Sequence, residues 1–453
     1  MIATLKDFQF DSVLQIKRWN GRALIATEMG LGKTIQALYW AYKHPTRRPV
    51  IIVCPASLKW NWQSEAENHF ELRADVLEGR GGKGDHLPNS QIFIVNYEIL
   101  PFWLKQLKRT KPQILILDEA QFITNHLAKR SKACRKLARG MKSVLGLTGT
   151  PMTNRPIELW HVMKVIRPDL FPSREKFAWR YCEPRFTPWG WKYDGSTNRK
   201  ELNNILRKNV MIRHLKKDVY KELPDKLMRT ITFRLDAKGR VEYNKAKSQF
   251  LCWLAEKSPV KAARAKKSLA MVKIGYLLRL VAKLKLEWTA KWISDFFEAN
   301  PGKKLICFTM HTFVIEYLMQ KFPHALMING SVNNRLRPKI VRQFQNNPKK
   351  NLFIGNWKAA GVGLTLTAAH HVAALDLPWT PADLAQGSDR AHRIGQKETV
   401  IIFYLLALDT LEEKQMGILW KKQKILAAIL DGTASENDLD IFAELLAAMN
   451  KEK

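Results

Sequence analysis

Short apolar runs recur along the chain, and longer segments of mixed polarity separate them. Continuous apolar runs of this kind are typical of parallel strands that are buried on both faces and alternate with helices. The pattern therefore predicts an α/β fold with two tandem lobes. The strands of the first lobe are expected at 22–27, 50–54, 91–96, 114–117 and 143–147, and those of the second at 304–309, 325–328, 351–354, 371–377 and 399–406.

The stretch 154–301 differs from both sets of runs, because it is rich in helix formers, lysine, arginine and tryptophan. Within it, 257–286 holds no acidic residue, and apolar residues such as Ile274 and Val281 recur there at helical spacing. This pattern predicts a basic amphipathic helix with one packed face, whose charges either contact DNA or are simply solvated. Similar apolar spacing after residue 410 predicts C-terminal helices that brace the second lobe.

Composition narrows the class of partner. The 453 residues include 75 Lys+Arg against 41 Asp+Glu, which gives a net charge of +34. Such an excess favours a polyanionic partner, with nucleic acid first, over a basic surface that serves only solubility. Five isolated cysteines suggest neither a zinc site nor a disulfide framework. The N-terminus has no leader-like pattern and no apolar run approaches the roughly 20 residues of a membrane span, so we expect a cytoplasmic protein that is neither secreted nor membrane-bound.

A glycine-rich segment with the sequence TEMGLGKT occupies 27–34, between the first predicted strand and a predicted helix. This is the context of a phosphate-binding loop, in which backbone N–H groups approach phosphate oxygens at a helix N-terminus. Lys33 would supply a charge to the β- and γ-phosphates, and Thr34 a hydroxyl to Mg²⁺. The strict spacing is not met, because Thr27 stands where the first glycine would be. The alternative is a glycine-rich turn with a chance lysine.

Two carboxylates, Asp118 and Glu119, follow the buried run 114–117. Ligands of α/β sheets bind at the carboxyl ends of the strands, so the pair is placed for phosphate chemistry. Asp118 is expected to hold Mg²⁺, mostly through its water shell, and Glu119 to orient or deprotonate the attacking water. Carboxylates at strand ends can instead cap helices, but that role does not explain both together.

Two arginines, Arg390 and Arg393, lie near the other end of the chain. An arginine that reaches the γ-phosphate accelerates phosphoryl transfer by about 10³- to 10⁵-fold. These arginines can reach it only if the second lobe folds back against the first. A basic surface helix would also contain such arginines, so the pair is informative only together with the other segments.

In combination these segments resemble the Snf2 family of superfamily 2 helicases, and further blocks match the motifs of the family in the correct order. The matching segments are 29–34 (motif I), 54–60 (Ia), 95–98 (Ib), 147–151 with 154–160 (III), 213–219 and 223–226 (the inter-lobe signature), 358–364 with Thr367 (V) and 386–396 (VI). The resemblance covers nearly the whole chain.

The resemblance implies two RecA-like lobes with helical insertions, which use ATP and Mg²⁺ to act on DNA without sequence preference. Gln9 would read the adenine. Further nucleotide contacts would come from Glu28, Met29, Gly30, Leu31, Gly32, Gly363 and Gln386. The residues that would couple the ATP site to DNA are Gln121, Thr148, Gly149 and Thr150. The candidate DNA contacts are Lys59, Trp60, Asn96, Tyr97, Thr150, Asn154, Thr309, Lys358, Trp379, Trp189 and Trp191.

Three positions depart from the family pattern. Thr27 stands where an aspartate is usual, Gln121 where the acidic box ends in histidine, and Ala360 where a glycine is usual. Gln121 can hydrogen-bond across the site but cannot titrate, so the departure affects coupling to DNA more than hydrolysis. Ala360 adds a methyl group to a loop that is expected to approach the DNA backbone.

One segment is similar to the HepA-related, fork-remodelling branch of annealing helicases. In it the tripeptide 180–182 is followed by the sequence PWGWKYDGS at 188–196. Aromatic residues on both sides of Gly190, with a closing Asp-Gly pair, predict a β-hairpin. Its tryptophans either stack on an unpaired base and wedge a junction open, or pack the protrusion onto its lobe.

The chain is therefore expected to contain a first, ATP-binding lobe (1–153), a helical insertion of that lobe with an aromatic hairpin near 184–196 (154–222), a linker and basic helical insertion of the second lobe (223–300), the second lobe (301–408) and C-terminal helices (409–453). We expect a monomeric DNA-dependent ATPase, of a compact bacterial or phage type, that remodels or unwinds forks and Holliday-type junctions in replication, recombination or repair. A duplex translocase that displaces proteins such as a stalled polymerase is one alternative. A non-hydrolysing DNA-binding protein is the other.

Overall fold

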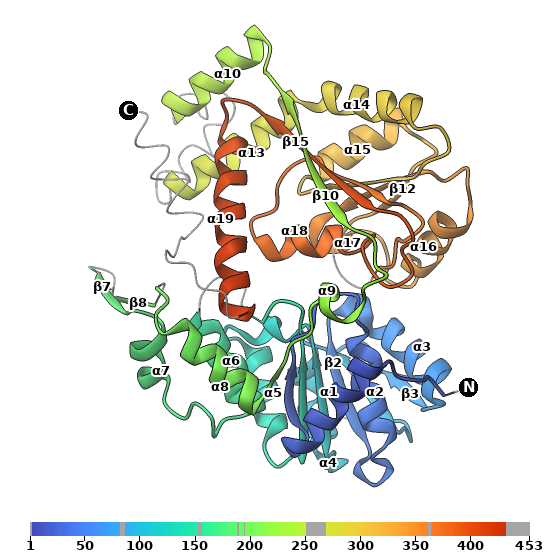
Figure 1. Ribbon diagram of the computed structural model, residues 1–453, viewed down its shortest axis with the longest axis vertical. Helices are drawn as coiled ribbons and strands as arrows, with labels where there is room; N and C mark the ends of the chain where they lie inside the picture. The colour runs from blue at the N-terminus through green and yellow to red at the C-terminus, as the bar shows by residue number, and fades with distance from the viewer. Residues whose placement is uncertain are drawn as a thin grey trace. The chain divides into compact units, whose positions relative to one another are not determined.

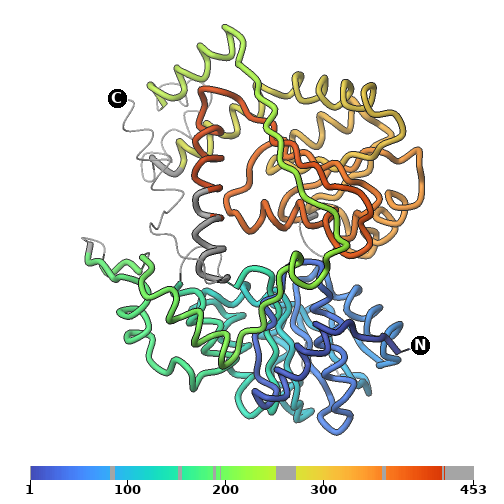
Figure 2. The backbone as a smooth tube through the Cα atoms, in the orientation of Figure 1, coloured from blue at the N-terminus to red at the C-terminus, as the bar shows by residue number. Residues whose placement is uncertain are grey.

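The computed structural model describes residues 2–81, 87–151, 156–187, 190–193, 195–250, 269–360 and 364–431. The chain divides into two compact units, which we call unit 1 (Met1–Glu222 with Ile425–Asp438) and unit 2 (Leu223–Lys424 with Leu439–Lys453), and each is described by itself. The helix at 411–431 begins in unit 2 and is described with it. Each unit contains one parallel sheet with helices packed on it (Figures 1 and 2). The expected α/β class, with two parallel sheets flanked by helices, is confirmed.

Unit 1 is built on a seven-stranded parallel sheet with the order β3-β4-β2-β5-β6-β1-β9. Its strands are β1 (Arg22–Ile25), β2 (Val50–Cys54), β3 (Ala74–Val76), β4 (Ile92–Asn96), β5 (Ile114–Asp118), β6 (Ser143–Leu147) and β9 (Met211–Ile212). All five strands that the apolar runs predicted are present. The two additional strands, β3 and β9, are short and lie at the edges of the sheet, where few apolar residues are needed.

The helices of unit 1 cover both faces of this sheet (Figure 1). They are α1 (Asp7–Arg18), α2 (Lys33–Tyr42), α3 (Lys59–Phe70), α4 (Leu100–Arg109), α5 (Lys129–Ala138), α6 (Pro156–Ile166), α7 (Arg174–Tyr181), α8 (Arg199–Asn209) and α9 (Lys216–Val219). A short antiparallel hairpin of β7 (Arg185–Thr187) and β8 (Gly190–Lys192) stands apart from the main sheet. The hairpin is where the sequence predicts one.

Unit 2 is built on a six-stranded parallel sheet with the order β10-β15-β14-β11-β13-β12. Its strands are β10 (Lys226–Phe233), β11 (Leu305–Thr309), β12 (Leu326–Ile328), β13 (Leu352–Asn356), β14 (His371–Ala374) and β15 (Val400–Ala407). The second set of predicted strands is present. The structure adds β10, which pairs along its whole length with β15, in a segment that the sequence assigned to a linker and a helical insertion. Most β10 side chains are exposed, so this edge strand has no apolar run.

The described helices of unit 2 are α10 (Ala237–Ser248), α13 (Leu269–Leu284), α14 (Leu286–Ala299), α15 (Thr312–Lys321), α16 (Arg337–Asn346), α17 (Trp357–Ala360), α18 (Pro381–Ser388) and α19 (Leu411–Asp431). Helix α13 forms the later part of the predicted basic amphipathic helix, and Ile274, Leu277 and Val281 on it are buried, as a packed face requires. The part of the predicted basic helix before residue 269 lies outside the described residues, and so does the part of the predicted C-terminal helices after residue 431. Within the described ranges, none of the helices is both long and apolar enough to cross a membrane.

Candidate nucleotide site

The glycine-rich segment forms a tight loop between β1 and α2. Gly30 and Gly32 have φ angles of 85° and 73°, in the left-handed region that favours glycine, and Gly32 is the N-cap of α2. A Cβ on Gly32 would come within 2.5 Å of Gln9 Nε2, so a side chain would also clash. The left-handed conformation of the two glycines lets the loop lead directly into the N-terminus of α2. There the backbone N–H groups and the helix dipole favour an anion.

Lys33, the first residue of α2, folds back over this loop. Its Nζ donates hydrogen bonds to the carbonyl oxygens of Thr27 at 2.9 Å and of Glu28 at 3.2 Å. Desolvation by burial lowers the pKa of Lys33 to about 8, while the carboxylates of Glu119 and Asp118 oppose that shift. The ammonium group is therefore held at the loop and lies within electrostatic reach of the acidic pair.

Asp118 ends β5, and both of its carboxylate oxygens accept hydrogen bonds. Oδ1 accepts from the Glu119 N–H at 2.9 Å, and Oδ2 accepts from the indole N–H of Trp62 at 2.8 Å. Burial, followed by the charge of Glu119, raises the pKa of Asp118 to about 7, whereas Trp62 and Lys33 lower it. The hydroxyl of Tyr97 donates to the Asp118 carbonyl at 2.7 Å. The buried Trp62 thus orients the carboxylate of Asp118, and the buried Tyr97 holds its backbone.

A chain of hydrogen bonds leads from Glu119 to the loop after β6. Gln121 Nε2 donates to Glu119 Oε2 at 2.7 Å, and Gln121 Oε1 accepts from the Thr148 hydroxyl at 2.7 Å. The Thr150 N–H in turn donates to Thr148 Oγ1 at 3.0 Å. Gln121 therefore bridges the acidic pair and the loop with both ends of its amide. Because the amide does not titrate, its donor and acceptor stay the same at any pH.

The loop after β6 also touches the phosphate loop directly. A Cβ on Gly149 would come within 2.6 Å of Met29 Cγ, so only glycine allows this approach. The four residues expected to couple the site, Gln121, Thr148, Gly149 and Thr150, are brought together beside the acidic pair and the phosphate loop. Their proximity makes coupling geometrically possible, and the role itself stays a prediction.

The segment 213–216 also forms hydrogen bonds to the phosphate loop and the end of β1. The Glu28 carboxylate accepts from the Lys216 N–H at 2.5 Å, and Arg213 Nη1 donates to the Ala26 carbonyl at 2.9 Å. Gln9 lies on the same loop, because its Nε2 donates to Leu31 O at 3.2 Å. The segment that resembles the inter-lobe signature therefore contacts the nucleotide loop, which the sequence did not predict.

The residues present fit ATP with Mg²⁺. The left-handed glycines leave the space that a Cβ would fill, and Lys33 supplies the charge for phosphate oxygens. Thr34 and Asp118 carry the oxygen ligands that Mg²⁺ prefers. Mg²⁺ usually keeps several water ligands and is bound through one or two carboxylates plus substrate phosphates, which is the role that Asp118 could fill. Bound Mg²⁺ supplies positive charge at the phosphates.

In unit 2, Arg390 and Arg393 follow α18 and share one acceptor. Arg390 Nη1 donates to Leu364 O at 3.3 Å, and Arg393 Nη1 donates to the same oxygen at 3.0 Å. Gln386, on α18, is buried. Gly363 lies outside the described residues. The two arginines are thus held together beside the end of the segment that resembles motif V, and their contact with a γ-phosphate stays a prediction.

Several candidate DNA contacts are buried in the structure, and their contact with DNA stays a prediction. Lys59 donates its Nζ to Leu77 O at 2.9 Å and is 7% exposed. Tyr97 is fully buried against Phe122, with ring centroids 5.3 Å apart. Asn96 is 7% exposed and donates its Nδ2 to Glu98 at 2.8 Å. These side chains support the carboxyl edge of the sheet from within and are not exposed for contact with a DNA backbone.

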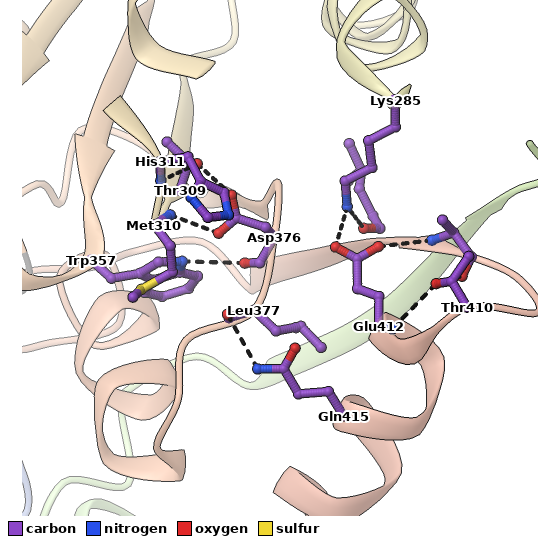
Figure 3. A network of polar contacts seen from close by, with 12 residues as sticks. Lys285, Thr309, Met310, His311, Trp357, Asp376, Leu377, Thr410, Glu412 and Gln415 are labelled. Carbon is purple, nitrogen blue, oxygen red and sulfur yellow. Dashed lines mark hydrogen bonds and ion pairs between the residues drawn. The ribbon is translucent and has the colours of Figure 1, made fainter. Parts of the chain in front are cut away.

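Thr309 is another buried candidate. It is fully buried, and its hydroxyl donates to Asp376, which also accepts the Met310 N–H at 2.6 Å (Figure 3). The Trp357 indole N–H donates to the Asp376 carbonyl at 3.2 Å. Thr309 therefore joins the ends of β11 and β14 and does not face solvent.

The other DNA candidates keep some exposure or are not described. Lys358 and Trp191 are exposed, and Trp60, Thr150 and Trp379 are partly exposed. Asn154 and Trp189 lie outside the described residues. The sequence reasoning also missed Trp62, which contacts the carboxylate of Asp118. The only signal in the sequence was its place two residues after Trp60, just beyond the segment 54–60 that resembles motif Ia.

A parallel α/β sheet with a phosphate loop after one strand and an acidic pair at the carboxyl end of another defines the P-loop class of nucleotide-binding proteins. Within that class, the SNF2-related domain matches residues 14–285 and the helicase conserved C-terminal domain matches residues 285–395. The first match covers more than half of the chain. The protein therefore belongs to the SNF2-related family.

Curated relatives match along almost the whole chain. A SWI/SNF-related matrix-associated actin-dependent regulator of chromatin subfamily A-like protein 1 from Xenopus tropicalis is 32% identical over 433 residues, which cover 94% of this chain and 45% of the relative. The DNA annealing helicase and endonuclease ZRANB3 of Mus musculus is 32% identical over 446 residues, which cover 94% of this chain and 41% of that protein. The chain thus spans less than half the length of these relatives.

A solved structure is also similar. The Sulfolobus solfataricus SWI2/SNF2 ATPase core in complex with dsDNA is 26% identical, covers 95% of this chain and 94% of its own, and has a TM-score of 0.46.

Proposed function

We propose that the protein is a DNA translocase that hydrolyses Mg-ATP to remodel or unwind branched DNA. The observation that carries the proposal is the hydrogen-bonded chain from Glu119 through Gln121 and Thr148 to Thr150. A chain of this kind links the group that orients the attacking water to a partly exposed loop at the same edge of the sheet. Occupancy of that loop by DNA can therefore act on hydrolysis.

The choice of branched DNA rests on three observations. Three of the relatives are named DNA annealing helicase and endonuclease, the net charge of +34 suits a polyphosphate partner, and the hairpin at β7–β8 carries the exposed Trp191. Contacts to phosphates position a DNA backbone but carry no sequence information, so binding without sequence preference follows.

The test is ATP turnover by the purified protein, without DNA and with linear duplex, forked or four-way DNA. We expect DNA to stimulate turnover, and forked or four-way substrates to be resolved only when ATP is hydrolysed. Turnover that DNA leaves unchanged would refute the motor. Stimulation by every DNA without any change to branched substrates would instead favour a duplex translocase that displaces proteins. Raising salt should weaken DNA binding steeply, because counterions are released at each phosphate contact.

Lys33→Ala should abolish ATP turnover and leave DNA binding within about twofold, because the ammonium group serves the phosphates and faces the loop carbonyls of Thr27 and Glu28. Lys43→Ala, at the exposed C-terminal end of the same helix, is the matched control and should keep full turnover. ATPase assays and fluorescence anisotropy with labelled duplex measure the two properties. Loss of DNA binding in the Lys33 variant would show that the role of the loop is misassigned.

Trp62→Phe should raise the Mg²⁺ concentration needed for half-maximal ATP turnover by about tenfold, because a hydrogen bond to a charged group contributes about 1.5–3 kcal/mol. Phenylalanine keeps an aromatic ring in the buried site but cannot donate to Asp118 Oδ2. Trp103→Phe is the control, since that buried indole donates at 3.2 Å to Gly79 O, away from the acidic pair. An unchanged Mg²⁺ dependence in the Trp62 variant would mean that the indole only fills space.

A further inference from the structure

Three aromatic side chains form an exposed cluster on unit 1, which we call the aromatic cluster. Phe186 and Trp191 are direct cross-strand partners in the β7–β8 hairpin, with ring centroids 5.3 Å apart, and Trp179 on α7 lies 5.4 Å from Trp191. Trp179, Phe186 and Trp191 are 58%, 72% and 48% exposed. Both contacts are edge-to-face, at 70° and 65°, so the rings hold one another while much of their surface faces solvent.

The other face of the hairpin is basic. Side chains of adjacent residues on a strand point to opposite faces, so Arg185 and Lys192 lie on the face away from Phe186 and Trp191. These two cations are also direct cross-strand partners, and both are exposed. Like charges placed directly opposite one another in a sheet are unfavourable. The hairpin therefore presents apolar rings on one face and two cations on the other.

The hairpin is also attached to unit 1 by contacts outside the aromatic cluster. At its base, the Gly195 N–H donates to the Cys182 carbonyl at 3.1 Å, and the Tyr181 hydroxyl donates to Glu201 at 2.7 Å. Tyr193 packs against the hydrophobic core, and the Arg174 guanidinium lies 4.7 Å from the centroid of its ring. The sequence left open whether the tryptophans of this segment pack the protrusion onto its lobe. Trp191 itself contacts Trp179 on α7 and is still 48% exposed, so its ring packs against unit 1 and keeps surface for a ligand.

We propose that the aromatic cluster binds the unpaired bases of single-stranded DNA at a junction, an inference that deepens the proposed function and rests on it. A single strand alternates flat apolar bases with phosphates, and the hairpin presents aromatic rings and cations in close succession. Stacking of bases on aromatic side chains tolerates every sequence, because each base has a π-face. In an intact duplex the bases already stack on one another, so the cluster distinguishes unpaired from paired DNA.

The experiment compares binding of fluorescent oligo(dT) and of a blunt duplex by anisotropy, for the full chain and for a Trp179→Ala/Trp191→Ala variant. We expect the variant to bind oligo(dT) about 5- to 150-fold more weakly, the range that corresponds to stacking on one base, and to bind duplex within about twofold of the parent. Phe102→Ala is the matched control, because Phe102 is 45% exposed on α4 of the same unit. It should change neither affinity.

Two further variants make the result specific. Trp191→Phe keeps a ring for stacking and should retain most of the oligo(dT) affinity, with an unchanged thermal midpoint. Lys192→Ala removes a charge from the opposite face and should weaken both DNA forms together. Equal weakening of oligo(dT) and duplex by the double tryptophan variant, or no weakening at all, would overturn the proposal, and capture of a protein in place of DNA would reassign the surface.

The outcome is separable from that of the proposed function. If the parent protein binds oligo(dT) through the aromatic cluster but DNA fails to stimulate its ATP turnover, the motor is refuted and the binding surface stands. If duplex stimulates turnover equally in the parent and in the double tryptophan variant while oligo(dT) affinity is also equal, the surface is refuted and the motor stands.

Discussion

Glu119→Gln should lower DNA-stimulated ATP turnover by about 10²- to 10⁴-fold, the range that positioned proton transfer contributes. The amide matches the carboxylate in size but can neither accept a proton from water nor carry its charge. The backbone of Glu119 has a φ of 50°, in the left-handed region, and its carboxylate accepts a 2.7 Å hydrogen bond from Gln121 Nε2. The substitution therefore removes the chemistry of the group and keeps its position.

Single-turnover measurements with excess protein separate the chemical step from nucleotide and DNA binding. Both affinities should stay within about threefold of the parent, because Lys33 and the phosphate loop are untouched. Glu67→Gln, on the exposed side of α3, is the matched control and should turn over ATP at the parent rate. A drop of less than about tenfold would assign the attacking water to another group, with Asp118 as the nearest candidate.

The same region shows what the sequence can predict. Strands β2, β4 and β5 were predictable because every residue in them is buried, so each one reads as an unbroken apolar run. The phosphate loop and the acidic pair were predictable because their chemistry depends on local spacing after such a strand. Strand β10 was not, because an edge strand with exposed side chains carries no apolar pattern and is specified by its pairing with β15.

The contacts that orient the site were also beyond the sequence. Trp62 and Asp118 are 56 residues apart, and their hydrogen bond depends on how α3 packs against β5. Lys59 looked like a surface cation, but a backbone carbonyl 18 residues away accepts its ammonium group in the interior. Residue type and spacing identify which groups are present. Burial decides whether a polar group faces DNA or another part of the protein.

Lys285→Met should destabilise unit 2 by about 3–5 kcal/mol, because it leaves a buried carboxylate without its partner. Lys285 and Glu412 are each 2% exposed, and their ion pair measures 2.5 Å (Figure 3). Lys285 Nζ also donates to Leu405 O at 2.8 Å, and Glu412 accepts the Ala407 N–H at 2.9 Å. The pair thus fixes the start of α19 to the end of β15 and to the junction of α13 with α14.

Urea unfolding, followed by circular dichroism, measures the loss in the free energy of unfolding. Hydrogen exchange identifies which of the unfolding transitions belongs to unit 2. Burial raises the pKa of Glu412, and Lys285 lowers it. Without Lys285 the pKa of Glu412 in the folded state lies further above its unfolded value, so the stability of the variant falls as pH rises above the ordinary pKa of a glutamate and through the raised pKa of Glu412. The deficit should therefore be smaller in acid than at neutral pH.

A Lys285→Met/Glu412→Leu double variant completes the cycle. Removing both charges should recover most of the loss, since replacing a buried ion pair by apolar groups is often neutral or stabilising. Lys291→Met, which breaks the exposed pair with Asp295 on α14, is the control and should cost no more than about 1 kcal/mol. If the double variant were as unstable as Lys285→Met, the hydrogen bonds to Leu405 and Ala407, and not the uncompensated charge, would account for the destabilisation.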